Sequence, residues 1–258
     1  MKNYKILVMG IIAIGIIFIG TSNPIVNLYK STNFINKDKD SNSDNKNYTI
    51  CIDPGHQEKG DSNLEPIGPG ASSKKARVSS GTTGVATKKP EYKLNLEASI
   101  VLKNILEGKG YNVVMTRESH NVNISNSERA IFGNEKKSDM VVRIHADSLD
   151  NSSKTGASIL VPQKDGKYTS TIYESSNKCA DLIKNELERM NIKVNGIFER
   201  GDLTGFNWSK VPVVLIEMGF MSNYNEDLMM SNPEYQRKMM QSVADGIEIY
   251  LKDRENNN

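Results

Sequence analysis

The stretch Tyr48-Thr-Ile-Cys-Ile-Asp-Pro-Gly-His56 joins an apolar run to a polar end. Two later stretches have the same form, Met140-Val-Val-Arg-Ile-His145 and Val211-Pro-Val-Val-Leu-Ile-Glu217. Apolar runs of this kind are typical of strands that are buried on both faces of a parallel sheet. Ligands and catalytic groups gather outside the carboxyl ends of such strands. We therefore expect each run to stop at its polar residue, and the two histidines and the glutamate to converge at one edge of a sheet.

Strand and helix patterns alternate along the rest of the domain. Their periodicity predicts helices over 91–106, 127–134, 175–190 and 233–251, and further strands over 112–116 and 157–161. In the last helix, Asn232 and Pro233 suit the cap and the first helical position. Strands separated by helices predict an α/β fold, a single domain over 48–254 with a mainly parallel twisted sheet covered by helices on both faces.

The beginning of the chain has the pattern of an export signal. Lys2 and Lys5 precede an uncharged apolar run over 6–20, as a positive region precedes the apolar part of a signal peptide. The run of about fifteen residues is shorter than the roughly twenty that cross a bilayer. Residues 1–29 therefore fit either a cleaved signal peptide or a retained membrane anchor, and the polar stretch 30–47 fits a disordered linker. We expect an exported protein, outside the cell, or on the outer face of the membrane if the anchor is retained.

Composition limits the partners and the use of cysteine. The net charge of +2 over 258 residues comes without a basic stripe, so nothing favours nucleic-acid binding. Membrane contact is expected only through the N-terminal segment. Cys51 and Cys179 fall in a predicted strand and a predicted helix, and we expect two buried thiols without a disulfide.

The scarce polar residues of the core predict a catalytic zinc site. Such a site commonly takes two histidines and one carboxylate, and it keeps a position for water. His56 and His145 supply the imidazoles. Glu91 lies on the inward stripe of its helix, three residues before Leu94, and is the expected carboxylate ligand of one zinc ion. Glu217 ends an apolar run and must be hydrogen-bonded, paired or functional.

Five motifs follow one another through this domain. They are Cys-Ile-Asp-Pro-Gly-His at 51–56, Glu-Tyr-Lys-Leu-Asn-Leu at 91–96, Met-Thr-Arg at 115–117, Arg-Ile-His-Ala-Asp-Ser at 143–148 and Leu-Ile-Glu-Met-Gly-Phe-Met-Ser-Asn at 215–223. Together they resemble the zinc-dependent N-acetylmuramoyl-L-alanine amidases of the amidase type 3 family. The resemblance implies that His56, Glu91 and His145 bind zinc and that Glu217 is catalytic. It also implies a peptidoglycan hydrolase, or autolysin, that cleaves the bond between N-acetylmuramic acid and L-alanine of the stem peptide.

Other polar residues are expected to support this site. Asp53 is expected to fix the turn that presents His56, and Asn95 to support the ligands from behind. Arg117 and Arg143 are expected to form structural ion pairs, with a smaller chance that they touch substrate. The remaining histidine, His120, lies in a polar stretch and is expected at the surface.

The segment between His56 and Glu91 departs from the usual family pattern, which is often shorter and has Gly-Gly after the histidine. We expect it to fold over or beside the site. Two of its carboxylates, Glu58 and Asp61, are alternative metal ligands that rank behind Glu91. Its basic residues could meet stem-peptide carboxylates; they are Lys74, Lys75 and Arg77.

Two alternatives accompany this hypothesis. One is an amidase-like binding or regulatory module that recognises the wall or a partner without cutting, or that needs a partner for activity. The other is a zinc peptidase that acts on ordinary protein. The sequence does not favour it, because it has no His-Glu-x-x-His motif. The expected partners are peptidoglycan and an activating or anchoring protein, and we expect a monomer.

Overall fold

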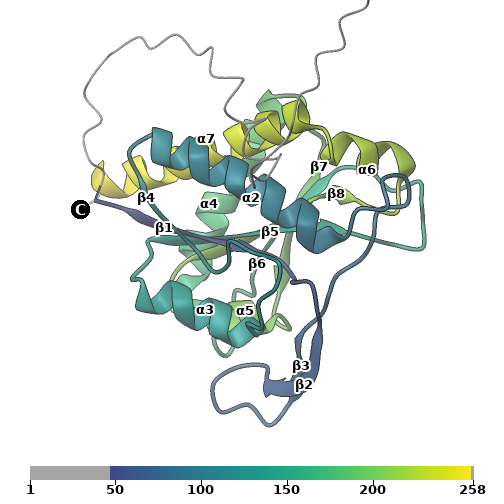
Figure 1. Ribbon diagram of the computed structural model, residues 1–258. Coiled ribbons are helices and arrows are strands. Elements are labelled where there is room, and N and C mark those ends of the chain that lie inside the picture. The colour runs from purple at the N-terminus through teal and green to yellow at the C-terminus, as the bar shows by residue number, and fades with distance from the viewer. Residues whose placement is uncertain (1–46, 257–258) are drawn as a thin grey trace, which may run out of the picture. The chain divides into compact units, whose positions relative to one another are not determined.

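The computed structural model describes residues 47–256 (Figure 1). The signal or anchor predicted over 1–29 and nearly all of the linker predicted over 30–47 lie outside the described residues. Within 47–256, no helix is both long enough and apolar enough to cross a membrane.

A six-stranded sheet forms the centre of the domain. Its strand order is β4-β1-β5-β8-β6-β7. In that order the strands span Asn112–Met115, Thr49–Pro54, Met140–Asp147, Val213–Phe220, Ala157–Pro162 and Val194–Arg200. The first four are parallel to one another, whereas β6 runs antiparallel to β8 and parallel to β7. The prediction of a mainly parallel sheet is therefore confirmed.

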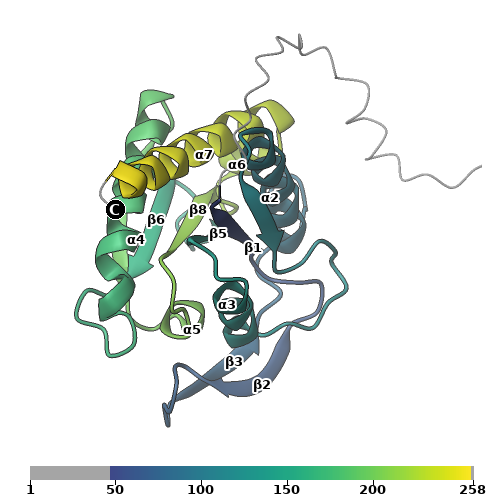
Figure 2. The ribbon, with the colours of Figure 1, turned by 90° about the vertical axis from the view of Figure 1, so that its left-hand side faces the viewer.

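Helices cover both faces of this sheet, as predicted (Figure 2). One face carries α2 (Glu91–Gly108), α4 (Ser170–Arg189) and α7 (Pro233–Asn256), and the other carries α3 (Asn126–Glu135) and the short α5 (Thr204–Asn207). The predicted cap of α7 is confirmed, because Asn232 Oδ1 accepts hydrogen bonds from the backbone N–H groups of Glu234 and Tyr235 at 2.8 and 3.2 Å.

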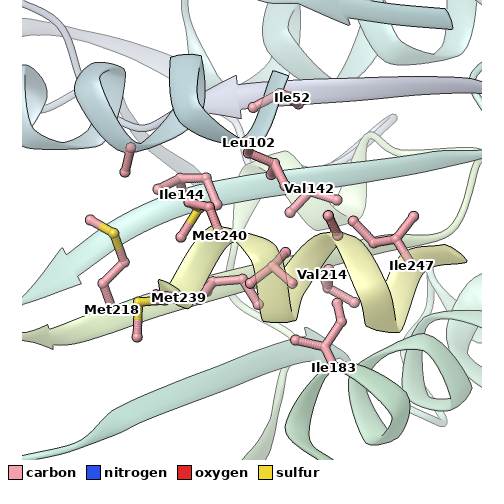
Figure 3. Close-up of a cluster of buried hydrophobic side chains, with 14 of the residues drawn as sticks. Ile52, Leu102, Val142, Ile144, Ile183, Val214, Met218, Met239, Met240 and Ile247 are labelled. Carbon is pink, nitrogen blue, oxygen red and sulfur yellow. The ribbon is translucent and has the colours of Figure 1, made fainter. Parts of the chain in front are cut away.

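Side chains along each strand point alternately to the two faces of the sheet, and each face has its own hydrophobic core. Val142 and Ile144 of β5 and Val214 of β8 pack with Met240 and Ile247 of α7 (Figure 3). Successive strand residues point to opposite faces. His145 and Glu217 therefore point to the other face, where Phe206 of α5 packs with Leu215.

Several elements were missed by the sequence pattern. Between His56 and Glu91, where the pattern predicts no strand, β2 (Asp61–Pro66) and β3 (Lys74–Val78) form an antiparallel hairpin. The short α6 (Tyr224–Met230), α5 and β7 were also missed, and α4 begins five residues before its predicted start. Cys51 and Cys179 are buried and unpaired, as predicted.

Candidate metal centre

His56, Glu91 and His145 come together at the carboxyl edge of the parallel strands. One potential ligand atom from each lies within 4.8 Å of the others, and no other such group of three occurs among residues 47–256. Glu91 Oε1 is 3.1 Å from His56 Nε2 and 3.4 Å from His145 Nδ1. Glu58 and Asp61, the alternative ligands, do not join this cluster. Three segments that are distant in sequence therefore supply two imidazoles and one carboxylate.

His56 is presented by a turn directly after β1. Its φ of 61° lies in the left-handed region, which few residues other than glycine adopt. Its Nδ1 lies 3.0 Å from the carbonyl oxygen of Ser79 and 2.9 Å from the Ser79 hydroxyl. An Nδ1–H that donates to this carbonyl leaves Nε2 free to bind a metal. The segment between His56 and Glu91 thus lies beside the site at Ser79.

Glu91 is the first residue of α2, and several donors fix its carboxylate. Oε1 accepts from Asn95 Nδ2 at 3.0 Å and from the Ala146 backbone N–H at 3.2 Å, and Oε2 accepts from the Thr82 N–H at 3.1 Å. Burial favours the protonated form, but interactions with the neighbouring His145 and His56 rings outweigh it and hold the pKa of Glu91 well below its usual range. The carboxylate is therefore ionised at neutral pH.

The environment of His145 suits a metal ligand. Its side chain is 12% exposed, and burial lowers its pKa to about 4 although the neighbouring Glu91 opposes the shift. The imidazole is consequently neutral at pH 7, the form that binds metals. Its Nε2 is buried without a hydrogen-bond partner in the described part of the chain. Two imidazoles beside an ionised carboxylate, with one nitrogen unsatisfied, fit a divalent transition metal.

Glu217 lies next to His145 on the neighbouring strand, where the two residues are directly paired. Its Oε2 is buried and has no hydrogen-bond partner among residues 47–256. Burial, with the negative charges of Glu91 and Asp147, raises the pKa of Glu217 well above its usual range, while Arg143 and Arg200 oppose the rise. A carboxyl group in this setting can exchange a proton with a group bound at the centre.

The apolar runs end at His145 and Glu217, and we expected the strands to end there too. This expectation is wrong. β5 continues to Asp147 and β8 to Phe220, and these two residues are also paired. The ladder shifts register between His145 and Asp147, and such irregularities occur often beside active sites. Both functional candidates therefore lie within hydrogen-bonded strands.

A buried ion cluster supports the turn that carries His56. Asp53, which is 1% exposed, accepts from Arg129 Nη1 and Arg143 Nε at 2.8 Å each, and from Thr116 Oγ1 at 2.5 Å. Burial alone would raise the pKa of Asp53, but the two arginines hold it far below its usual range. Arg129 also donates to the His56 carbonyl oxygen at 3.0 Å. Sequence reasoning missed Arg129, because a charged residue in a short helix gives no sign of burial.

The expectations for Arg117 and His120 need correction. Arg117 forms no ion pair in the described residues and instead donates to the carbonyl oxygens of Pro54, Gly55 and Tyr92 at 3.0, 2.9 and 2.8 Å. It fixes the same turn through backbone groups. His120 is half-buried instead of lying at the surface, and its ring packs edge to face on Tyr92 with 5.3 Å between ring centroids.

The basic residues of β3 do not reach the three-residue cluster through any contact in the described chain. Lys75 pairs with Asp202 at 2.9 Å, and Arg77 pairs with Glu128 at 2.9 Å. Arg77 also pairs with Asp61 at 3.0 Å, and Asp61 lies outside the metal-binding group of three. These residues lie on the hairpin, on the same side of the sheet as α3 and α5 (Figure 2).

Comparison with known proteins agrees with this geometry. A protein from Neisseria meningitidis serogroup B named N-acetylmuramoyl-L-alanine amidase AmiC is 24% identical over 238 residues, covering 78% of this chain and 52% of that relative. The chain thus spans about half of that relative's length.

Solved structures have the same fold. The N-acetylmuramyl-L-alanine amidase Ami1 from Mycobacterium smegmatis has a TM-score of 0.74 at 24% identity, covering 81% of this chain and 99% of that one. The CwlD amidase from Clostridioides difficile, solved in complex with the GerS lipoprotein, has a TM-score of 0.60 at 24% identity, covering 80% of this chain and all of that one (100%).

A family model described as N-acetylmuramoyl-L-alanine amidase matches residues 50–249, which is nearly the whole described domain. This match confirms the family that the five motifs indicate. The chain belongs to the N-acetylmuramoyl-L-alanine amidase family.

Proposed function

We propose that this protein is a peptidoglycan hydrolase that cleaves the amide bond between N-acetylmuramic acid and L-alanine of the stem peptide. The observation that carries the proposal is the joint placement of an ionised Glu91, a neutral His145 and a Glu217 carboxyl with an unsatisfied oxygen. We propose zinc as the metal, with His56, Glu91 and His145 as its ligands. Membership of the family supports the substrate class.

The proposed mechanism divides binding and proton transfer between two sets of residues. When bound, zinc would supply a water of lowered pKa and would polarise the scissile carbonyl. Glu217 Oε2 accepts the proton of the attacking water as the new C–O bond forms. The same group then donates that proton to the alanine nitrogen as the C–N bond breaks. The raised pKa of Glu217 suits the second step, in which the carboxyl group donates its proton to the leaving nitrogen.

The setting of the enzyme is also a proposal. We propose export through residues 1–29, a linker over 30–47 and a catalytic domain over 48–254 that acts as a monomer on the cell wall. An activating or anchoring partner is part of this proposal, because the related CwlD amidase was solved with a lipoprotein. A module that binds without cutting is disfavoured, since all three expected ligands and the expected catalytic glutamate are present around one centre.

Digestion of purified peptidoglycan tests the function. The zinc-loaded protein should release stem peptides with a free N-terminal L-alanine, detected by mass spectrometry, and a chelator should stop the release. Intact glycopeptide in both samples, with zinc still bound, would instead favour the binding module or the need for an activator.

Gly55→Ala should weaken zinc binding. A Cβ at this position would lie 2.2 Å from His145 Cε1, so the imidazole must move. Changes to the residues that orient a metal ligand typically lower metal affinity about 10- to 100-fold, and we expect a loss of that size. Competition with a zinc indicator measures it.

Gly108→Ala is the matched control, because a Cβ there has no neighbour within 4 Å. Its zinc affinity should equal that of the wild type. Unchanged affinity in Gly55→Ala would argue that His145 does not bind the metal in this position.

A further inference from the structure

One face of the sheet beside the candidate centre becomes exposed along β7, at Phe198, whereas Ser158 of β6 is buried. Ser158 of β6 is paired with Glu217, and Leu160 is paired with Phe198 of β7. Paired residues share a face of the sheet, as do residues two apart in one strand. Phe198 and Arg200 therefore lie on the same face as Glu217. We call the surface formed by Ser158, Gly196, Phe198 and Arg200 the β6–β7 strip.

An irregularity in β7 directs an aromatic ring toward the centre. Ala157 is paired with Val194 and Ile159 with Ile197, so two residues of β7 oppose Ser158 alone. Gly196, in this bulge, has a φ of 148°, and a Cβ there would lie 3.3 Å from the ring of Phe198. The ring thus lies over Gly196, level with Ser158. It stands about 10 Å from β8, two strand spacings away, and Phe198 is 46% exposed.

Arg200 stands at the end of the strip with hydrogen-bonding capacity to spare. Its Nε and Nη2 donate to Asp202 at 2.7 and 2.9 Å. Lys75 of the hairpin donates to the same carboxylate at 2.9 Å, so two cations share one anion and one positive charge is left over. Nη1 of Arg200 has no partner in the described part of the chain, and the side chain is 40% exposed. Arg200 is therefore held in place and still able to bind an anion.

The charged groups around the candidate centre indicate what Arg200 can bind. The charges that act on Glu217 come from two carboxylates, Glu91 and Asp147, and from two arginines, Arg143 and Arg200. Arg143 is buried and paired with Asp53, so Arg200 is the arginine of the two that can meet a substrate carboxylate. The positive charge of Arg200 acts on both Glu217 and Asp147, so it reaches the same region. In the uncut substrate the lactyl carboxyl group is part of the amide bond and carries no charge. The free carboxylates therefore belong to the stem peptide.

We propose that Arg200 binds a carboxylate of the stem peptide that lies along the β6–β7 strip, and so determines specificity for the peptide arm of the substrate. This inference rests on the proposed amidase function. An arginine suits the role because its planar guanidinium binds carboxylates in fixed geometry. Phe198 gives the peptide an apolar floor between Arg200 and Glu217.

Two synthetic muramoyl peptides test the inference. They differ only in whether the residue after L-alanine carries a free carboxylate or a carboxamide. Arg200→Gln in the zinc-loaded protein should raise the KM for the carboxylate substrate about tenfold or more, the usual effect of losing a charged hydrogen bond. Its kcat should stay roughly unchanged, as expected when only binding is lost. Its KM for the carboxamide substrate should also stay the same.

Two further variants sharpen the comparison. Arg200→Lys keeps the charge without the planar group, so its KM for the carboxylate substrate should fall between those of the wild type and Arg200→Gln. Arg189→Gln, which removes an exposed ion pair with Glu186 on α4, should match the wild type on both substrates. Equal changes of KM on both substrates in Arg200→Gln, or none, would overturn the inference. A wild type that keeps its zinc but cleaves neither substrate would overturn this inference for the protein acting alone. As with intact peptidoglycan, it would favour the binding module or the need for an activator.

Discussion

Glu217→Gln should lower turnover by about a thousandfold, within the range found when a general acid–base group is removed. Glutamine has nearly the same shape but cannot take the proton of the attacking water. Because Glu217 is not among the three ligands, the variant should keep its zinc and its fold. Steady-state hydrolysis of a soluble muramoyl peptide gives the rate, and metal analysis of the same sample gives the zinc content.

Glu118→Gln is the control for this loss. Its side chain is 66% exposed and pairs with Lys103 away from the centre, so its rate should equal that of the wild type. Substantial turnover by Glu217→Gln would remove Glu217 from the mechanism. Loss of zinc together with activity would show that Glu217 acts as a ligand.

Asp53→Asn should destabilise the domain by about 3–5 kcal/mol, the usual effect of removing one partner of a buried ion pair. The change leaves Arg129 and Arg143 buried without their shared anion. Urea unfolding of the metal-free protein, followed by circular dichroism, measures the free energy. By contrast, Glu118→Gln breaks an exposed pair and should change it by about 1 kcal/mol or less. A similar small change in Asp53→Asn would mean that the buried cluster does not stabilise the fold.

The pH dependence of stability gives a second readout for Asp53. The pKa of the folded state lies below the ordinary value of 3.8, so the stabilisation is present above that pH and is lost as the pH falls further. The free energy of unfolding of the wild type should therefore drop below about pH 4. In Asp53→Asn this part of the drop should be absent, since asparagine does not titrate.

The sequence predicted those parts of the fold that follow from local pattern. The runs that lead to His56, His145 and Glu217 are apolar because their strands are buried on both faces, and this pattern is readable without a structure. Helical periodicity identified Glu91, since a carboxylate on the inward stripe of a helix needs a partner.

The features that were missed depend on contacts between distant segments. β2 and β3 are largely exposed and polar, so their pairing leaves no apolar alternation to recognise. β7 has the same weakness at the sheet edge, which hid both Phe198 and Arg200. The buried Arg129 becomes intelligible only with Asp53, 76 residues away along the chain.

Digestion in water enriched in ¹⁸O tests the central claim most directly. If water attacks the lactyl carbonyl, mass spectrometry of the products should find one ¹⁸O on the muramic acid carboxylate and none on the released alanine peptide. The label should appear with zinc and should be absent with a chelator. Release of the peptide without this label, or label at another bond, would contradict the account.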